Sequence, residues 1–305
     1  MNRDDIDWGG PMPALTTPFR ADGTLDEEGF VANLDRLLAA GATGCVAAGC
    51  TGEFWALSQG EKARLAKLAV ETAAGRGPVI LGAAAIRVEE VLEVAHAAKE
   101  AGCAGFLVTP PYFVRNTDAE IVAHFERIAA QAPLPMVIYN IPGNAANAVT
   151  PEIAGTLADL DPVVAIKESS GDWVQFHRTL TATRGRIRVF CGPSSVFGVA
   201  ATLAGADGLI DCFPNVWTGC LDIWTATRAG RMAEAWRLQE MGLALTNLFT
   251  SEGRTLYPAT KAAMDMLALP GGGAPRPPLL PLGGAALDGL RSEVERLLGP
   301  GARAA

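Results

Sequence analysis

A single lysine closes an uninterrupted apolar run in the stretch VVAIKESSG, where Lys167 follows Val163–Ile166. Burying an ammonium group is costly, so this side chain either reaches water at the rim of the fold or stays partly desolvated for chemistry. A tyrosine, Tyr139, closes another apolar run, PMVIYN, where it either caps the core or reacts. If the two residues are neighbours, a neutral amine can attack a carbonyl while the phenol transfers a proton. The pair suits imine chemistry.

Three further stretches hold candidate polar residues. In GCTGEFW, backbone N–H groups beside Gly52 and the hydroxyl of Thr51 can form a small cradle for a carboxylate, although the glycines also suit a tight turn. In GLIDCF, Asp211 either caps the helix that follows or faces a substrate hydroxyl or cation. In TPPYF, Tyr112 follows two prolines at the end of an apolar run.

The elements that must position these residues follow from a repeated alternation of short apolar runs and longer segments of helical period. The runs are apolar on successive residues, as in strands that are covered on both faces. We predict eight strands, at Met12–Phe19, Thr43–Gly49, Pro78–Ala84, Ala104–Pro110, Pro135–Asn140, Val163–Glu168, Ile187–Gly192 and Gly208–Phe213.

This alternation predicts an α/β fold, a (β/α)₈ TIM barrel over residues 1–230. A doubly wound sheet is disfavoured, because no G-x-G-x-x-G turn follows the first strand. Residues 231–305 are predicted to form a C-terminal helical extension that packs on the barrel, with two helices broken near Gly253 and Pro258, a Pro/Gly connector and a final amphipathic helix. Active sites of such barrels lie at the carboxyl ends of the strands, where the candidate residues fall.

The amino-acid composition limits the classes of molecule that the protein is expected to bind. The 305 residues carry a net charge of −8 with a pI near 5.0, so no basic field favours nucleic acid or an anionic membrane. No apolar stretch is long enough for a membrane span and the start lacks a signal peptide, so we expect a cytoplasmic protein that binds small molecules and copies of itself. Six scattered cysteines lack metal-ligand spacing, which predicts reduced thiols and no metal site.

Three motifs occur in order at three predicted strand ends, namely G-x-T-G-E, then Y-N, then I-K-E. Together they resemble the dihydrodipicolinate synthase and N-acetylneuraminate lyase family of class I, Schiff-base-forming lyases, from PALTTPF to TLYPATKAAMDMLALPGG. The resemblance implies that Lys167 forms an imine with pyruvate or another 2-oxo acid and that Tyr139 shuttles protons. Thr51 with its neighbours Cys50 and Gly52 would hold the 2-oxo acid carboxylate. It implies no metal or organic cofactor.

The same resemblance bears on assembly and on the rest of the site. Tyr112 falls where the family has a tyrosine that crosses into the neighbouring subunit, so a tight homodimer is expected, assembled in pairs into a tetramer. The expected substrate-binding set is completed by residues that follow the fifth, seventh and eighth strands, namely Asn144, Gly192, Ser194, Ile210 and Asp211.

Departures from the family pattern narrow the substrate. Cys50 replaces a threonine and cannot relay a proton as a hydroxyl does. Asn144 stands where dihydrodipicolinate synthases have an arginine for the second substrate's carboxylate, and Ser194 and Ser195 stand where sialic acid lyases have acidic residues. These differences argue against the lysine-pathway enzyme and against a sialic acid lyase.

Three activities remain open from the sequence. The first is an aldolase or synthase that joins a 2-oxo acid to an aldehyde, favoured by AIKESSGDW. The second is a dehydratase of a 2-oxo-3-deoxy sugar acid, because GCTGEFW and PPYF are similar to ketodeoxyglucarate dehydratases. The third is a non-catalytic paralogue that binds a 2-oxo acid, which the weakened relay at Cys50 keeps open.

Overall fold

The computed structural model describes residues 3–299 and contains one sheet of eight parallel strands. Neighbouring strands follow the order β1-β8-β7-β6-β5-β4-β3-β2. The strands are β1 (Gly10–Pro11), β2 (Cys45–Ala47), β3 (Val79–Gly82), β4 (Gly105–Val108), β5 (Met136–Asn140), β6 (Val163–Glu168), β7 (Arg188–Cys191) and β8 (Gly208–Leu209). The predicted (β/α)₈ architecture is confirmed.

The barrel closes between the first two strands. The backbone N–H of Leu15 donates to the carbonyl of Val46 at 2.9 Å, and the N–H of Val46 donates to the carbonyl of Pro13 at 2.9 Å. The predicted bounds of the first strand are wrong, since β1 lies before Met12–Phe19 and only a single bridge at Ala14 pairs with β2. Two prolines without N–H donors interrupt the ladder here, which explains the short strand.

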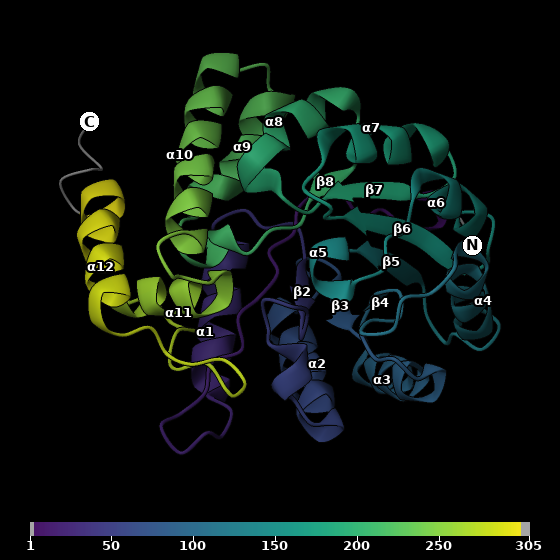
Figure 1. The fold of residues 1–305 in the computed structure, drawn as a ribbon, viewed down its shortest axis with the longest axis horizontal. Coiled ribbons are helices and arrows are strands. Elements are labelled where there is room, and N and C mark those ends of the chain that lie inside the picture. Colours follow the sequence, from purple (N-terminus) through teal and green to yellow (C-terminus); the bar gives the residue numbers. More distant parts are fainter. Residues whose placement is uncertain (1–2, 300–305) are drawn as a thin grey trace.

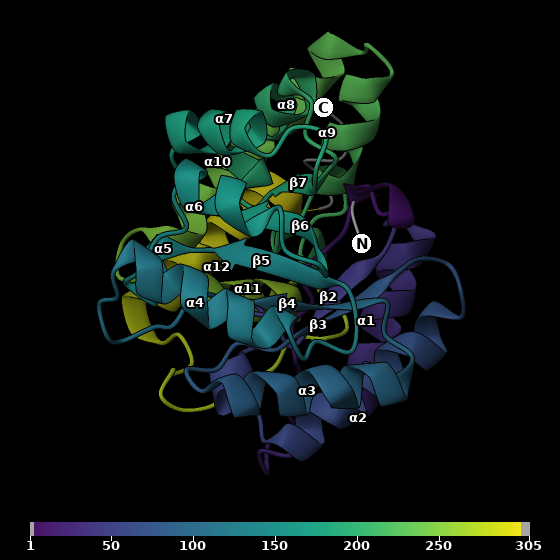
Figure 2. The same cartoon turned by 90° about the vertical axis from the view of Figure 1, so that its right-hand side faces the viewer.

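Helices cover the outside of the barrel, and Figures 1 and 2 show them arranged around the strands. They are α1 (Glu27–Ala39), α2 (Gln59–Ala73), α3 (Val88–Ala101), α4 (Asp118–Ala129), α6 (Pro151–Leu157), α7 (Trp173–Ala182), α8 (Ser194–Ala204) and α9 (Gly219–Arg228), while the short α5 (Pro142–Ala145) directly follows β5 at the carboxyl end of the barrel. The start of α2 shows why a helix forms there, because Ser58 and Glu61 make a reciprocal capping box.

Two apolar layers hold the barrel together. Inside it, side chains from the strands fill the centre, including Val46, Ile80, Leu107, Val137 and Phe190. The alternate side chains of the strands pack outward against the helices in a larger core. Burial on both faces is the reason why the strands are apolar on successive residues.

The C-terminal helices lie to one side of the barrel in Figure 1. They are α10 (Met232–Thr250), α11 (Leu256–Met266) and α12 (Gly284–Leu298). The predicted break at Gly253 is confirmed, whereas Pro258 lies in the first turn of α11, where a proline is tolerated. They share a core with Phe213 and Val216 from the loop after β8, so α10 and α11 are fixed close to the carboxyl ends of the strands. No described helix has both the length and the apolar character to cross a membrane.

The predicted boundary at residue 230 falls between α9 and α10. The outer ends of the two predicted units, residues 1–2 and 300–305, lie outside the described residues.

Candidate active site

Lys167 and Tyr139 stand opposite each other on neighbouring strands. The register of β5 and β6 pairs Tyr139 with Lys167 and Asn140 with Glu168. The ammonium nitrogen of Lys167 lies 4.1 Å from the centre of the Tyr139 ring. Both side chains are buried, with exposed fractions of 6% and 4%. The two predicted residues are therefore adjacent at the carboxyl end of the barrel.

The residues that follow each of them on the chain point to the opposite side of the sheet. The Asn140 side-chain amide donates to the Glu168 carboxylate at 2.6 Å, and the backbone N–H of Ser170 donates to its other oxygen at 2.6 Å. The backbone N–H of Val149 donates to Asn140 at 2.9 Å. Glu168 is thus occupied in joining β5 to β6, and its charge is directed away from Lys167.

Burial dominates the electrostatics of the pair. It lowers the pKa of Lys167 below the usual lysine range, and the carboxylate of Asp211 opposes part of this effect. It raises the pKa of Tyr139 well above the usual tyrosine range, so the phenol stays protonated. Among the described residues, no carboxylate lies within ion-pair distance of Lys167. A buried amine with a lowered pKa and no ion pair can supply the neutral nucleophile.

A cavity of about 170 Å³ opens beside Lys167, and we call it the lysine cavity. Predicted residues on its wall are Cys50, Thr51, Tyr139, Lys167, Gly192, Ile210 and Asp211. Helices α10 and α11 contribute Thr246, Thr250, Leu256 and Tyr257. The cavity thus collects residues from the ends of β2, β5, β6, β7 and β8 under a roof from the C-terminal extension.

Asp211 is held by the start of α8. Its carboxylate accepts hydrogen bonds from the Ser194 hydroxyl at 3.1 Å and from the backbone N–H groups of Ser195 and Cys212 at 2.8 and 2.7 Å. The expected alternative, that it caps the helix after it in the chain, is wrong, because the next helix, at Phe213–Asn215, receives no side-chain cap, and the Asp211 carboxylate instead accepts from Ser195 in the first turn of α8. Ser194 therefore orients Asp211 and does not line the cavity, whereas Ser195 does.

Gly52 shapes the loop after β2 without lining the lysine cavity. Its carbonyl accepts a hydrogen bond from the Thr17 hydroxyl at 2.8 Å. The next residue, Glu53, has a left-handed backbone with φ of 55° and a carboxylate that is fully buried. That carboxylate forms an ion pair with Lys261 of α11, so the loop is anchored to the C-terminal extension.

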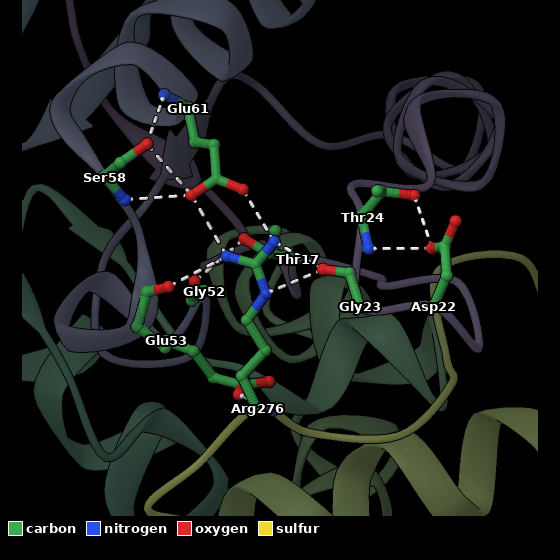
Figure 3. A network of polar contacts seen from close by, with 10 residues as sticks. Thr17, Asp22, Gly23, Thr24, Gly52, Glu53, Ser58, Glu61 and Arg276 are labelled. Atoms are coloured by element: carbon green, nitrogen blue, oxygen red, sulfur yellow. Dashed lines mark hydrogen bonds and ion pairs between the residues drawn. The ribbon is translucent and has the colours of Figure 1, made fainter.

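Arg276 provides a second anchor for the same loop, as Figure 3 shows. Its guanidinium donates to both oxygens of Glu61, at 2.6 and 3.0 Å, and to the carbonyl of Ala56 at 2.9 Å. Its backbone N–H donates to Glu53 at 2.9 Å. A residue of the Pro/Gly connector thereby fixes the loop that carries Cys50 and Thr51.

Two predicted residues lie elsewhere. Tyr112 and Asn144 line a second cavity, of about 350 Å³, which we call the aromatic cavity. It is lined by Cys50, Phe54, Trp55, Thr109, Tyr112, Ile141, Asn144, Ala145, Tyr257, Pro278 and Leu279. It shares Cys50, Ile141 and Tyr257 with the lysine cavity, so the two cavities meet at a common wall. The expectation that Tyr112 reaches a neighbouring subunit stays a prediction.

Comparison with known proteins agrees with this geometry. The model of the dihydrodipicolinate synthetase family matches residues 7–297. The chain belongs to this family. A 4-hydroxy-tetrahydrodipicolinate synthase of Agrobacterium fabrum is 33% identical, over 84% of this chain and 96% of its own length. An uncharacterized DapA-like lyase of Rhizobium meliloti is 29% identical, over 95% of this chain and 96% of its own length.

A solved structure in the family has the same fold. YagE of E. coli K12, a prophage protein of the dihydrodipicolinic acid synthase family crystallised in complex with pyruvate, superposes with a TM-score of 0.89 at 26% identity. The alignment covers 96% of this chain and 99% of that one. Membership of the dihydrodipicolinate synthetase family supports lyase activity for this chain.

Sequence reasoning missed Tyr257, which lies on both cavities in this family member. The Cys50 thiol lies on the same cavity wall as the phenols of Tyr139 and Tyr257, and both phenols influence its pKa. The Asn144 side-chain amide donates to the Tyr257 oxygen at 3.2 Å. Burial raises the pKa of Tyr257, which keeps its proton in place. The only signal was the TLYPATK stretch, because no spacing connects residue 257 to residues 50 and 139.

No metal centre is evident between residues 3 and 299, where no three His, Cys, Asp or Glu side chains are grouped as ligands. All six cysteines are free and buried. The lysine cavity therefore offers an amine, two phenols, two thiols and one carboxylate as its reactive groups.

Proposed function

We propose that the protein is a Schiff-base lyase in which Lys167 condenses with pyruvate or another 2-oxo acid and a C–C bond to an aldehyde is made or broken. The observation that carries this proposal is the buried Lys167 amine, free of an ion pair and 4.1 Å from the ring centre of Tyr139. Family membership supports a lyase, and the pyruvate complex of YagE concerns a relative of the same fold.

The chemistry balances without an external electron acceptor. The neutral amine of Lys167 adds to the 2-oxo carbon, and loss of water gives an iminium. Tyr139, which is protonated at rest, gives its proton to the hydroxyl group that leaves as this water and then takes up a proton from C3, so the iminium receives the C–H electron pair and becomes an enamine. The enamine carbon attacks the aldehyde carbon, the aldehyde oxygen takes the proton, and water releases the product and restores the amine. Cleavage is the reverse sequence.

Positions around Lys167 suit the parts of a 2-oxo acid. Thr51 and the glycine-flanked backbone after β2 lie on the cavity wall, where a hydroxyl and N–H groups can bind the carboxylate. Gly192 allows the backbone after β7 to lie against Ser169, since a Cβ at this position would overlap the Ser169 hydroxyl oxygen. Asp211 lies on the same wall with its orientation fixed, and it favours the charged iminium electrostatically.

The lysine-pathway reaction is a poor fit for this chain. Its second substrate would need a cation near Asn144, but that side chain is uncharged and already donates to Tyr257. No lysine or arginine of the described residues lines the aromatic cavity. We therefore propose an acceptor other than the substrate of the lysine-pathway synthase. Independence from metals and organic cofactors, a homo-oligomeric state and a cytoplasmic location are part of the same proposal.

Borohydride trapping tests the imine directly. Protein incubated with pyruvate and borohydride should gain the mass of one reduced pyruvyl group, and the adduct should map to Lys167. Lys167→Ala should abolish it, whereas Lys62→Met should retain it, because Lys62 is equally buried but lies outside the lysine cavity. Absence of the adduct from the wild type, or its persistence in Lys167→Ala, would refute the proposal.

Product analysis separates lyase from dehydratase chemistry. Incubation with 2-oxo-3-deoxy acids should release pyruvate if the imine breaks a C–C bond. Formation of a 2-oxo semialdehyde without pyruvate would instead assign dehydration to the same lysine. An adduct without turnover of any acid or aldehyde would assign a binding paralogue.

A further inference from the structure

We infer that the aromatic cavity binds the carbonyl acceptor and that this acceptor is an uncharged aromatic aldehyde. The inference rests on the proposed function, since it names the second substrate of the same imine reaction. It depends on three properties of the cavity, namely its rings, its lack of charge and its contact with the lysine cavity.

Four rings form much of the cavity wall. Phe54 and Trp55 meet at nearly a right angle with their centres 5.3 Å apart, and Phe54 meets Tyr112 in the same way at 6.1 Å. Trp55 and Tyr257 are tilted against each other at 5.4 Å. Aromatic groups prefer such edge-to-face and tilted neighbours, so a further ring finds partners of favourable geometry here. A flexible aliphatic chain gains only the area that it buries.

The cavity carries no ionisable side chain of opposite charge for an anionic acceptor. Its polar lining residues are Cys50, Thr109, Tyr112, Asn144 and Tyr257, and two of these already bond to each other. Lys62 touches the ring of Phe54 at 5.9 Å but does not line the cavity. A carboxylate would therefore be buried without a counter-ion. The Trp55 indole N–H and the Thr109 hydroxyl lack partners and can each pair with an oxygen of the acceptor, but they are too few for a polyhydroxylated chain, whose other hydroxyls would stay unpaired.

The common wall places the acceptor beside the nucleophile. Cys50, Ile141 and Tyr257 line both cavities, so an aldehyde group at this wall faces the side on which Lys167 lies. The volume of about 350 Å³ is within the range of small-molecule sites, which begins at roughly 300 Å³. The ring would occupy the aromatic cavity while the aldehyde carbon points to the enamine.

The reaction then joins C3 of the enamine to the aldehyde carbon. The aldehyde oxygen takes one proton, and water hydrolyses the imine. Pyruvate and an aryl aldehyde together give a 4-aryl-4-hydroxy-2-oxo acid with no other reactant.

A panel of aldehydes tests the inference, with pyruvate as donor and the 4-hydroxy-2-oxo acid measured by mass spectrometry. Benzaldehyde should be used with a kcat/KM at least about 100-fold above glyceraldehyde, succinic semialdehyde and hexanal, the scale of a few well-placed apolar contacts. Equal use of hexanal or of either polar aldehyde would overturn the aromatic assignment while the pyruvyl adduct still supports the imine. Absence of the adduct would refute the proposed function itself.

Two variants locate the site. Trp55→Ala should lower kcat/KM for benzaldehyde by at least about tenfold, whereas Trp236→Ala, on an exposed tryptophan of α10, should not change it. Leu279→Arg places a cation at the half-buried connector wall and should shift preference from benzaldehyde toward succinic semialdehyde. Because Leu279 is not a core residue, this variant keeps the test valid if Trp55→Ala fails to fold. An unchanged preference in Leu279→Arg would contradict binding in this cavity.

Discussion

The lysine cavity and the aromatic cavity share three residues, but most of their other lining residues come from different parts of the chain. Residues at the ends of five strands supply the reactive groups of the first, where the register of β5 and β6 fixes Tyr139 against Lys167. The second is lined by residues from short helices, loops and the Pro/Gly connector, including Phe54, Tyr112 and Leu279. Under the proposed function, rigid strands hold the groups that react, and the loops above them hold the groups that select the acceptor.

Removing the Tyr139 hydroxyl should give the largest effect, and it should act on turnover in the lysine cavity and not on aldehyde binding in the aromatic cavity. Tyr139→Phe keeps the ring beside Lys167 but removes the proton carrier, so turnover should fall by about 10² to 10⁴. The pyruvyl adduct should still form, and KM for the aldehyde should be unaffected because this hydroxyl is absent from the aromatic cavity. Unchanged turnover in steady-state assays would remove Tyr139 from the mechanism.

Breaking the anchor of the β2 loop should damage both cavities together. Lys261→Met leaves the Glu53 carboxylate buried without its ion-pair partner and should lower the free energy of unfolding by about 3 to 5 kcal/mol. Lys67→Met, which removes an exposed pair with Glu71, should cost less than about 1 kcal/mol. Urea unfolding measures both, and equal effects would show that the buried pair does not hold the loop.

Adduct formation in the lysine cavity should depend on pH, whereas aldehyde binding in the aromatic cavity should not. Since the pKa of Lys167 is lowered, the rate of adduct formation should rise with pH and level off below the usual lysine range. Asp211→Asn removes a charge that favours the ammonium, so this midpoint should move to lower pH. Binding of benzaldehyde should not follow this titration, because the pKa values of Tyr112 and Tyr257 are raised and both phenols stay neutral. A midpoint that does not move in Asp211→Asn would contradict the electrostatic role.

The smallest effect is expected at the common wall. Cys50→Thr replaces the thiol beside Tyr139 and Tyr257, which is a weak hydrogen-bond donor, with a hydroxyl. The rate of exchange of the pyruvate C3 protons should then rise by up to about tenfold, which corresponds to the free energy of one hydrogen bond. Proton NMR in deuterated water measures the exchange, with Cys220→Ser, a buried cysteine outside both cavities, as the control. No rise would show that the relay does not pass through this position.

Much of the barrel could be predicted because strand burial on both faces leaves a direct trace in the sequence. Consecutive strands of a barrel are neighbours, so Tyr139 and Lys167 could be paired from chain order alone. Loop conformation leaves no such trace. The separation of Tyr112 and Asn144 from Lys167, and the arrival of Tyr257 from α11, depend on packing between distant segments, which no local pattern encodes.

Arg276 has a further consequence for the order in which the protein becomes active. During synthesis, Lys167 and Tyr139 leave the ribosome more than a hundred residues before Arg276, which fixes the loop that carries Cys50 and Thr51. A nascent chain can thus pair its barrel strands while one wall of each cavity still lacks its support. Catalytic competence should consequently appear late in translation, after the connector has emerged and docked.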